Sequence, residues 1–251
     1  MIEHTGSGDP ARTLALLWRT QERTSRKGKP DLSVDRIVRA GIEIADGEGL
    51  RALSMRRVAE SLGVGTMSLY TYVPGKGELV DVMVDTVAGE TGRAEEFDGW
   101  RAHLTYIARE NLGMYRRHPW LMQVAPNRTV LGPQVAAKYD YELRAVDGIG
   151  LTDVEMDSVV NLVLGHVQNA ARGLAGASQT ERETGLTDQQ WWDAAAPFLM
   201  KVFDPGRYPL AARVGNAVGE LHSSAYSPEH AFEFGLERIL DGVEQLVTTR
   251  G

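Results

Sequence analysis

The chain of 251 residues contains no cysteine, which excludes disulfide bonds, a thiol nucleophile and thiolate metal ligands. This absence is typical of a reducing compartment, and we expect the protein to act in the cytoplasm. The apolar runs are far shorter than the ~20 residues that a membrane-spanning helix needs, so we expect no membrane partner. The N-terminus also lacks the charged-then-apolar pattern of a signal peptide.

Runs that alternate with a period of two are scarce, so a sheet is not expected. Apolar residues recur instead at helical spacing, which predicts an all-α fold. Residues 1–10 and the insert 204–227 are rich in small and turn-forming residues, and we expect irregular structure there, with at most one short helix in the insert. The predicted helices cover residues 13–22, 33–47, 54–61, 66–72, 76–92, 97–117, 129–148, 152–177, 188–203 and 228–248.

The charge is distributed unevenly along the chain. The net charge is −7, yet residues 1–76 carry 12 Lys and Arg against 9 Asp and Glu, whereas residues 77–251 carry 15 against 25. A basic head on an acidic body is expected when one end of a protein meets DNA phosphates. The pattern therefore predicts three parts: a flexible basic extension (1–32), a DNA-binding head (33–76) and a larger helical body (77–251).

The segment 54–76 has the pattern of a helix-turn-helix. The first helix places Val58 and Leu62 on one face, and Gly63 then ends it, because glycine adopts a positive φ without steric cost. Ala59 is small enough to let two helices cross closely, and Leu69 buries the second helix. A generic helical hairpin does not require this order of residues, so the segment predicts a helix that enters the major groove of DNA.

These residues resemble the tetracycline-repressor (TetR) family of bacterial regulators. The resemblance is carried by the runs IVRAGIEIAD (37–46), LSMRRVAESLGV (53–64) and SLYTYV (68–73), followed by Lys76 and Leu79. The body resembles the C-terminal domain of the tetracycline-repressor branch more loosely, in the number and order of its helices. The resemblance implies an all-α homodimer that represses transcription from a palindromic operator and releases it when a small molecule enters the body.

The predicted DNA contacts lie on the helix-turn-helix. Arg56 occupies a position that contacts DNA in the family, and Ser54 is both a predicted helix cap and a phosphate ligand. Met67 either touches a thymine methyl group or acts as a spacer, and Tyr72 either contacts phosphate or joins the core. The complete predicted set is Ser54, Arg56, Thr66, Met67, Ser68, Tyr70, Thr71, Tyr72 and Lys76.

The basic residues before the head allow two interpretations. Arg23, Arg26, Lys27 and Lys29 either form an arm in the adjacent minor groove or add affinity that is independent of sequence. Only the first interpretation predicts a preference for A·T pairs next to the operator.

The body offers candidates for a small-molecule site, although aromatic and methionine residues in a helical body are commonly plain core. An apolar cavity with a few polar anchors is the usual composition of such a site. The histidines lack metal-ligand spacing, so neither a metal nor another cofactor is expected, and tetracycline is not the expected inducer. The candidates are Tyr106, Met114, His118, Trp120, Met122, His166, Gln168, Asn169, Trp192 and Phe198.

The family resemblance implies dimerisation through the helices 152–177 and 228–248. The first has small residues such as Gly165 among Val159, Leu162, Val163 and Val167, although this stripe is equally suited to monomer core. Two other functions remain as alternatives. One is a helical enzyme with a catalytic His118 or His166, which no recognised catalytic motif supports, and the other is DNA binding without sequence preference.

Overall fold

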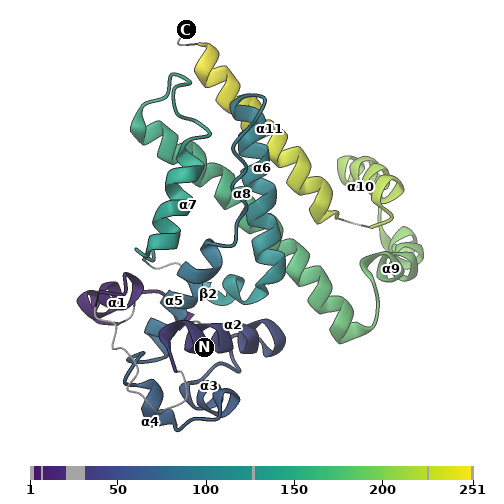
Figure 1. Ribbon diagram of the computed structural model, residues 1–251. Helices are drawn as coiled ribbons and strands as arrows, with labels where there is room; N and C mark the ends of the chain where they lie inside the picture. Colours follow the sequence, from purple (N-terminus) through teal and green to yellow (C-terminus); the bar gives the residue numbers. More distant parts are fainter. Residues whose placement is uncertain (1–2, 7, 21–31, 126–127, 225, 250–251) are drawn as a thin grey trace.

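The computed structural model describes residues 3–6, 8–20, 32–125, 128–224 and 226–249, and these form an almost entirely helical molecule (Figure 1). The predicted all-α fold is confirmed, apart from one pair of two-residue strands. The elements are β1 (Glu3–His4), α1 (Pro10–Leu17), α2 (Val34–Glu48), α3 (Met55–Leu62), α4 (Thr66–Leu69), α5 (Lys76–Ala88), α6 (Gly99–Arg117), a 3₁₀ helix η1 (Pro119–Gln123), β2 (Val124–Ala125), α7 (Pro133–Leu143), α8 (Asp153–Thr184), α9 (Asp188–Val202), α10 (Pro209–His222) and α11 (Pro228–Thr248).

Helices α2, α3 and α4 form the head. Ser33 and Ser54 cap α2 and α3, since each hydroxyl accepts a hydrogen bond from the backbone N–H three residues later, at 3.2 and 3.1 Å. Gly63 ends α3 with a φ of 66°, which is the left-handed conformation expected from the sequence. These local signals fix the angle between α3 and α4.

Helix α5 joins the head to the body. Its residues Leu79 and Met83 are fully buried in the same apolar cluster as the head core. That cluster also contains Met114 and Trp120, which belong to the body. The head and the near end of the body therefore share one continuous core, and α5 runs through it.

The body is built on three long helices, α6, α8 and α11, which cross one another above the head (Figure 1). Val159, Val163 and Val167 of α8 are buried against Leu236 and other residues of α11. The apolar stripe that the sequence offered for a dimer interface is thus largely monomer core, which was the alternative interpretation. Leu162 is the exception, because its side chain is 55% exposed.

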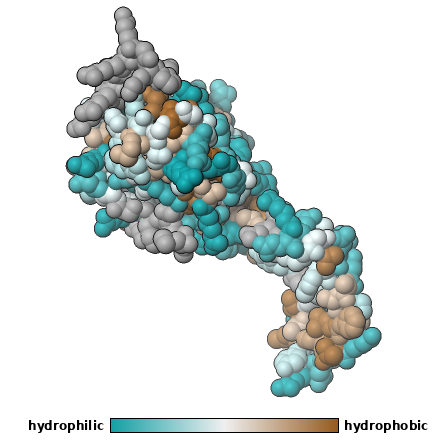
Figure 2. Space-filling model, turned by 90° about the horizontal axis from the view of Figure 1, so that it is seen from below, coloured by the Kyte–Doolittle hydropathy of each residue, from teal (hydrophilic) through white to brown (hydrophobic). Residues whose placement is uncertain are grey.

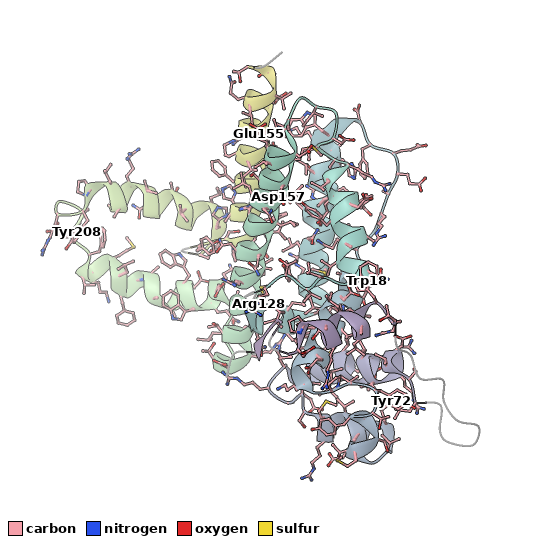
Figure 3. All side chains as sticks on the ribbon, turned by 90° about the vertical axis from the view of Figure 1, so that its left-hand side faces the viewer. Trp18, Tyr72, Arg128, Glu155, Asp157 and Tyr208 are labelled. Carbon is pink, nitrogen blue, oxygen red and sulfur yellow. The ribbon has the colours of Figure 1, made fainter. Side chains whose placement is uncertain are left out.

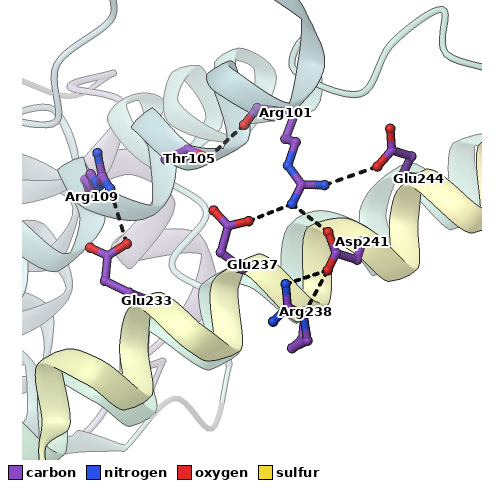
Figure 4. Close-up of polar contacts among 8 residues, drawn as sticks. All are labelled: Arg101, Thr105, Arg109, Glu233, Glu237, Arg238, Asp241 and Glu244. Carbon is purple, nitrogen blue, oxygen red and sulfur yellow. Dashed lines mark hydrogen bonds and ion pairs between the residues drawn. The ribbon is translucent and has the colours of Figure 1, made fainter. Parts of the chain in front are cut away.

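A polar edge holds α6 to α11. The guanidinium of Arg101 lies 2.7 Å from carboxylate oxygens of both Glu237 and Asp241, and Arg109 lies 3.2 Å from Glu233 (Figure 4). Asp241 also accepts a hydrogen bond from Arg238, and the pKa of Asp241 is lowered by its hydrogen bonds to Arg101 and Arg238. Such exposed pairs contribute little stability singly, but together they fix the rotation of α11 about its axis.

The N-terminal region agrees with the prediction in part. The helix predicted over 13–22 is present as α1, although it begins earlier and ends at Leu17. The extension 1–32 was otherwise expected to be flexible, with residues 1–10 irregular, yet β1 pairs in parallel with β2 and α1 packs against α5. The physical reason is that Leu17 is buried in the shared core, so burial of apolar surface anchors the segment. The basic residues Arg23, Arg26, Lys27 and Lys29 lie outside the described residues.

Several other boundaries differ from the prediction. The helix predicted over 66–72 ends at Leu69, and the helix predicted over 76–92 ends at Ala88. The insert 204–227, expected to be mostly loop, contains the 14-residue helix α10, which begins at a proline as helices often do. The helix predicted over 129–148 is shortened to α7 because Pro133 sets its first turn. Helix α8 continues to Thr184, beyond its predicted end, because its positions after 177 still favour helix up to Gly185.

Helices α9 and α10 project sideways from the three-helix body as an arm (Figure 1). None of the residues of these two helices, all of which the structure describes, is buried. Apolar side chains gather on the projecting end at the right of Figure 2, and they include Phe198, Met200, Val202, Leu210 and Leu221. None of the described helices is long and apolar enough to cross a membrane.

Candidate DNA-binding face and candidate effector cavity

The helix-turn-helix presents one polar face outward. Val58, Leu69 and Val73 are fully buried and hold α3 and α4 on the core of the head. The two helices then leave Arg56, Met67, Ser68, Tyr70 and Thr71 exposed. Met67 is 78% exposed, so its side chain makes little contact with the rest of the chain and is open to a partner.

Arg56 is exposed and is held by an ion pair within its own helix. Its Nε donates to a carboxylate oxygen of Glu60 at 2.8 Å, and the Arg56 side chain is 83% exposed. The bond lowers the pKa of Glu60 and raises the pKa of Arg56, so both groups are charged at neutral pH. Since exposed ion pairs contribute little stability, Arg56 can exchange Glu60 for another partner at little cost.

Four predicted contacts have structural duties as well. Ser54 caps α3, as described above, and its residue remains exposed. Thr66 and Lys76 are half-buried at the first positions of α4 and α5. Tyr72 is half-buried and packs against the core of the head, as its position in Figure 3 indicates. The structure therefore favours the core interpretation of Tyr72 over a pure DNA contact.

A cavity of about 930 Å³ lies between the head and the body. The end of α2 forms one wall of the cavity, and η1 with the end of α6 forms a second wall. Helix α8 and the first turn of α11 form the third wall. Tyr115 contributes a phenol whose pKa is raised by burial, so it stays protonated and can donate a hydrogen bond. The lining includes Asp46, Gly47, Glu48, Gly49, Tyr115, Arg116, Pro119, Trp120, Met122, Gln123, Arg172, Leu174, Glu181, Arg182 and Glu229.

Of the residues predicted to bind ligand, Trp120 and Met122 line this cavity. Met114 does not, because it is packed into the shared core at 7% exposure. Tyr106 stacks at a tilt on Phe97, with the two ring centroids 5.2 Å apart, at the other end of α6. Both side chains make packing contacts in the structure, as apolar side chains in a helical body commonly do.

His118 is buried between two carboxylates rather than in the cavity. Its Nδ1 lies 2.8 Å from Oδ1 of Asp46 in the head, and its Nε2 lies 2.8 Å from Oε2 of Glu90, just beyond α5. Trp120 donates from its indole N–H to the same Asp46 oxygen at 2.8 Å. A residue predicted to bind ligand or to catalyse is therefore a polar link between the head and the body.

The remaining candidates also lie away from the cavity. The Nε2 atom of His166 is 2.8 Å from the carbonyl oxygen of Phe232, and the imidazole stacks on the Phe232 ring. Asn169 is exposed on α8, and the neighbouring Gln168 is half-buried. Trp192 and Phe198 belong to α9 in the arm and do not meet the other predicted ligand residues. Periodicity places each on a helix but cannot say which helices meet.

Sequence reasoning missed Asp46, Tyr115, Arg116 and Arg172 as cavity residues. Tyr115 and Arg116 directly follow the predicted Met114. The prediction therefore named the same turn of α6, but the side chains that line the cavity lie on a different face of that helix. Asp46 gave no signal, because nothing in a head helix indicates that its last turn borders the body. Among the described residues, no group of three His, Asp or Glu side chains is arranged to hold a metal ion.

The fold and its exposed face define a helix-turn-helix protein with a helical regulatory body. The comparisons with known proteins make the assignment specific. Residues 37–83 match the model of the tetR family of bacterial regulatory proteins, and residues 93–247 match that of the tetracyclin repressor-like C-terminal domain. The chain therefore belongs to the TetR family of transcriptional regulators.

Individual relatives agree with this assignment. The HTH-type transcriptional repressor DrrR1 of Streptomyces coeruleorubidus is 49% identical over 251 residues, which is 99% of this chain and 90% of DrrR1. Apo ActR from Streptomyces coelicolor is 26% identical with a TM-score of 0.74, over 89% of this chain and 100% of ActR. ActR in complex with actinorhodin is 28% identical with a TM-score of 0.72, over 85% of this chain and 96% of ActR.

Proposed function

We propose that this protein is a cytoplasmic repressor that binds a palindromic operator as a homodimer and releases it when a small molecule occupies the body. The observation that carries the proposal is the exposed face of α3 and α4, mounted on a rigid core and followed by a cavity that borders the head. Similarity to a named repressor and to ActR, whose complex with actinorhodin is known, supports the same function.

The DNA-binding face has the chemistry that base reading needs. An arginine such as Arg56 can pair with guanine through two hydrogen bonds, worth ~1–3 kcal/mol of discrimination against the wrong base. The exposed hydroxyls of Ser68, Tyr70 and Thr71 are suited to phosphate oxygens, which position the head but carry no sequence information. One short helix reads few bases, so two heads are needed for a specific site.

A second copy of the chain would supply the other head. The outward faces of α8 and α11 carry exposed Leu162 and Phe234. Gly165 and Gly242 lie on the same two helices, and a Cβ built on either meets no described atom within 4 Å. Small residues that face open space let another helix approach closely. The apolar arm of α9 and α10 projects beside the start of α11 (Figure 1). In a dimer, the second copy would cover the apolar side chains of this arm as well.

The cavity is the proposed effector site. It has the volume of a drug-sized site, and it combines Trp120 and Met122 with the polar groups of Tyr115 and Arg172. Because Asp46 at the end of α2 forms part of the wall, a molecule that fits only one head position shifts the equilibrium toward that position. Its effect is limited to its differential affinity for the two states, typically ~1–3 kcal/mol.

The proposal is tested by selecting operator DNA. The purified full-length chain is incubated at ~150 mM salt with a random-sequence duplex library, and the retained DNA is sequenced. A recurring inverted repeat with half-sites ~34–36 Å apart is the expected result. Enrichment of no motif, with binding that disappears as salt rises, would leave only DNA binding without sequence preference.

A further inference from the structure

The N-terminal segment lies across the junction of the linker helix and the body. Residues 3–6 and 8–20 contact α5 on one side and residues 124–125 and 128–131 on the other. Figure 3 shows Trp18 and Arg128 close to this junction, above Tyr72 of the head. The resemblance to the TetR family and the family models begin after this segment, at residues 33 and 37, so its role needs an explanation of its own.

The first end of the segment is fixed by backbone geometry. Glu3 and His4 pair with Val124 and Ala125 in the parallel strands β1 and β2. The hydroxyl of Thr5 then donates to the carbonyl oxygen of Arg128 at 2.6 Å. These bonds tie the segment to the part of the body that immediately follows η1.

The segment also reaches the linker helix. The backbone N–H of Gly6 donates to both carboxylate oxygens of Asp81 in α5, at 3.1 and 3.3 Å. Gly6 has a φ of 64°, a conformation that suits glycine and turns its N–H toward Asp81. Asp81 is buried, and the desolvation of its carboxylate raises its pKa, so the Gly6 N–H is a needed partner.

The other end of the segment is fixed by side chains. The indole N–H of Trp18 donates to the carbonyl oxygen of Leu131 at 2.9 Å, and Leu17 is buried in the shared core. Arg19 forms an ion pair of 2.5 Å with Asp35 in the first turn of α2. The segment thus contacts the body, the linker and the head within 17 residues of Glu3.

A second buried carboxylate completes the arrangement. Asp85, one helical turn after Asp81, accepts hydrogen bonds from the backbone N–H groups of Gln134 and Val135, at 3.0 and 2.9 Å. Helix α5 is therefore held by two carboxylates, one bonded to the N-terminal segment and one to the start of α7. Movement of α5 relative to residues 124–125 and 128–135 has to break or carry along both sets of bonds.

We propose that residues 3–6 and 8–19 act as a strap that fixes the linker helix α5 against residues 124–125 and 128–135 and so sets the position of the head. The strap is a conformational device beyond the proposed effector site, although its effect on operator affinity rests on the proposed function. It restrains α5 directly, whether the cavity is empty or occupied.

The test is hydrogen exchange of the full-length protein without DNA. The double variant Thr5→Val/Trp18→Phe removes the bonds to Arg128 and Leu131; valine has the shape of threonine, and phenylalanine keeps an aromatic ring, although a smaller one, at residue 18. We expect exchange of the α5 amides to become about tenfold faster while the α8 and α11 amides are unchanged, because opening would be local. Thr20→Val is the control, since the Thr20 hydroxyl donates to the carbonyl oxygen of Ala15 within the same segment. Unchanged exchange in α5 would overturn the proposal.

A second pair of variants guards against simple loss of folding. Asp81→Asn keeps an oxygen that accepts from Gly6, whereas Asp81→Ala removes it. The strap predicts faster exchange in α5 for Asp81→Ala alone, and equal exchange for the two variants would contradict it. Affinity for the selected operator is then measured for each variant, with weakened binding expected wherever α5 is loosened. Because exchange needs no DNA, it tests the strap even if the operator selection fails.

Discussion

Single side chains of the head suit either a proposed contact with DNA or a fixed contact with the body. Arg56 is exposed and lightly held, whereas His118 is buried and doubly held, so the two residues suit opposite roles. An exposed arginine exchanges partners readily, and this is what reading DNA requires. Removing a buried imidazole that bonds to two carboxylates costs stability, so such a residue suits a permanent contact between the head and the body.

Replacement of Arg56 should weaken specific binding selectively. For Arg56→Ala we expect a loss of ~1–3 kcal/mol of operator affinity, with sequence preference relaxed at one position in each half-site. Fluorescence anisotropy with the selected duplex and single-base variants measures both effects. Arg144→Ala is a matched control, because Arg144 forms a similar exposed pair with Asp140 in α7, and it should bind the operator normally. Uniform weakening across all duplexes would instead make Arg56 a phosphate ligand.

Loss of the His118 link should cost stability. His118→Asn removes the imidazole that joins Asp46 to Glu90, although Asp46 keeps its hydrogen bond from Trp120. Both carboxylates are partly exposed, so we expect a decrease of ~1–3 kcal/mol in the free energy of unfolding. Urea denaturation followed by circular dichroism measures it. His230→Asn, at an exposed position of α11, should leave the midpoint unchanged. An unaltered midpoint for His118→Asn would show that the link has no net strength.

At the scale of elements, a substitution at Gly165 of α8 can distinguish an effect on monomer stability from an effect on dimer formation. Gly165→Leu should stabilise an isolated helix, because leucine has the higher helix propensity by ~0.5–1 kcal/mol. In a dimer, however, the added side chain would hold the second helix away. We therefore expect a monomer by analytical ultracentrifugation together with an unchanged or raised melting temperature.

Gly113→Leu on α6 is the control for this substitution. A Cβ at Gly113 meets only the end of the Arg117 side chain at 3.4 Å, so the dimer should persist. A Gly165→Leu protein that remains dimeric would move the interface away from this face of α8.

Elements with clear periodicity were predictable from the sequence. Caps at Ser33 and Ser54 and the break at Gly63 determined the head, because those signals act over three or four residues. The helix within the N-terminal segment was predicted, but the attachment of the segment was not, since it depends on contacts with Asp81 and Arg128, more than 70 residues away. The same reason explains the site: the DNA-binding face follows from one local motif, whereas the cavity requires knowing which helix ends meet.

At the scale of the whole molecule, the arm of α9 and α10 exposes apolar side chains that no other part of the described chain buries. Phe198 is 71% exposed, and Val202 and Leu210 are also exposed. We expect Phe198→Asp/Val202→Asp to leave the circular dichroism melting curve of the monomeric fold unchanged, because no described contact of the core is lost. The same variant should dissociate more readily, with its dimer dissociation constant raised at least about tenfold.

Sedimentation at several protein concentrations measures the dissociation constant. The control Asp204→Asn/Glu220→Gln alters polar groups outside the apolar patch and should assemble normally. If the aspartate variant dimerises as tightly as the unchanged protein, the arm serves something other than assembly between two copies.

The last turn of α2 borders the cavity at Asp46, and α2 is at the same time one of the helices of the head. Substitutions among residues 46–49 that refit the cavity to a new molecule will therefore also move the DNA-reading surface. Effector preference and the position of the head are therefore expected to change together when these residues are substituted. Diversification of effector preference in such a regulator should proceed through α8 and η1, where the opposite walls can change while the grip on the operator is preserved.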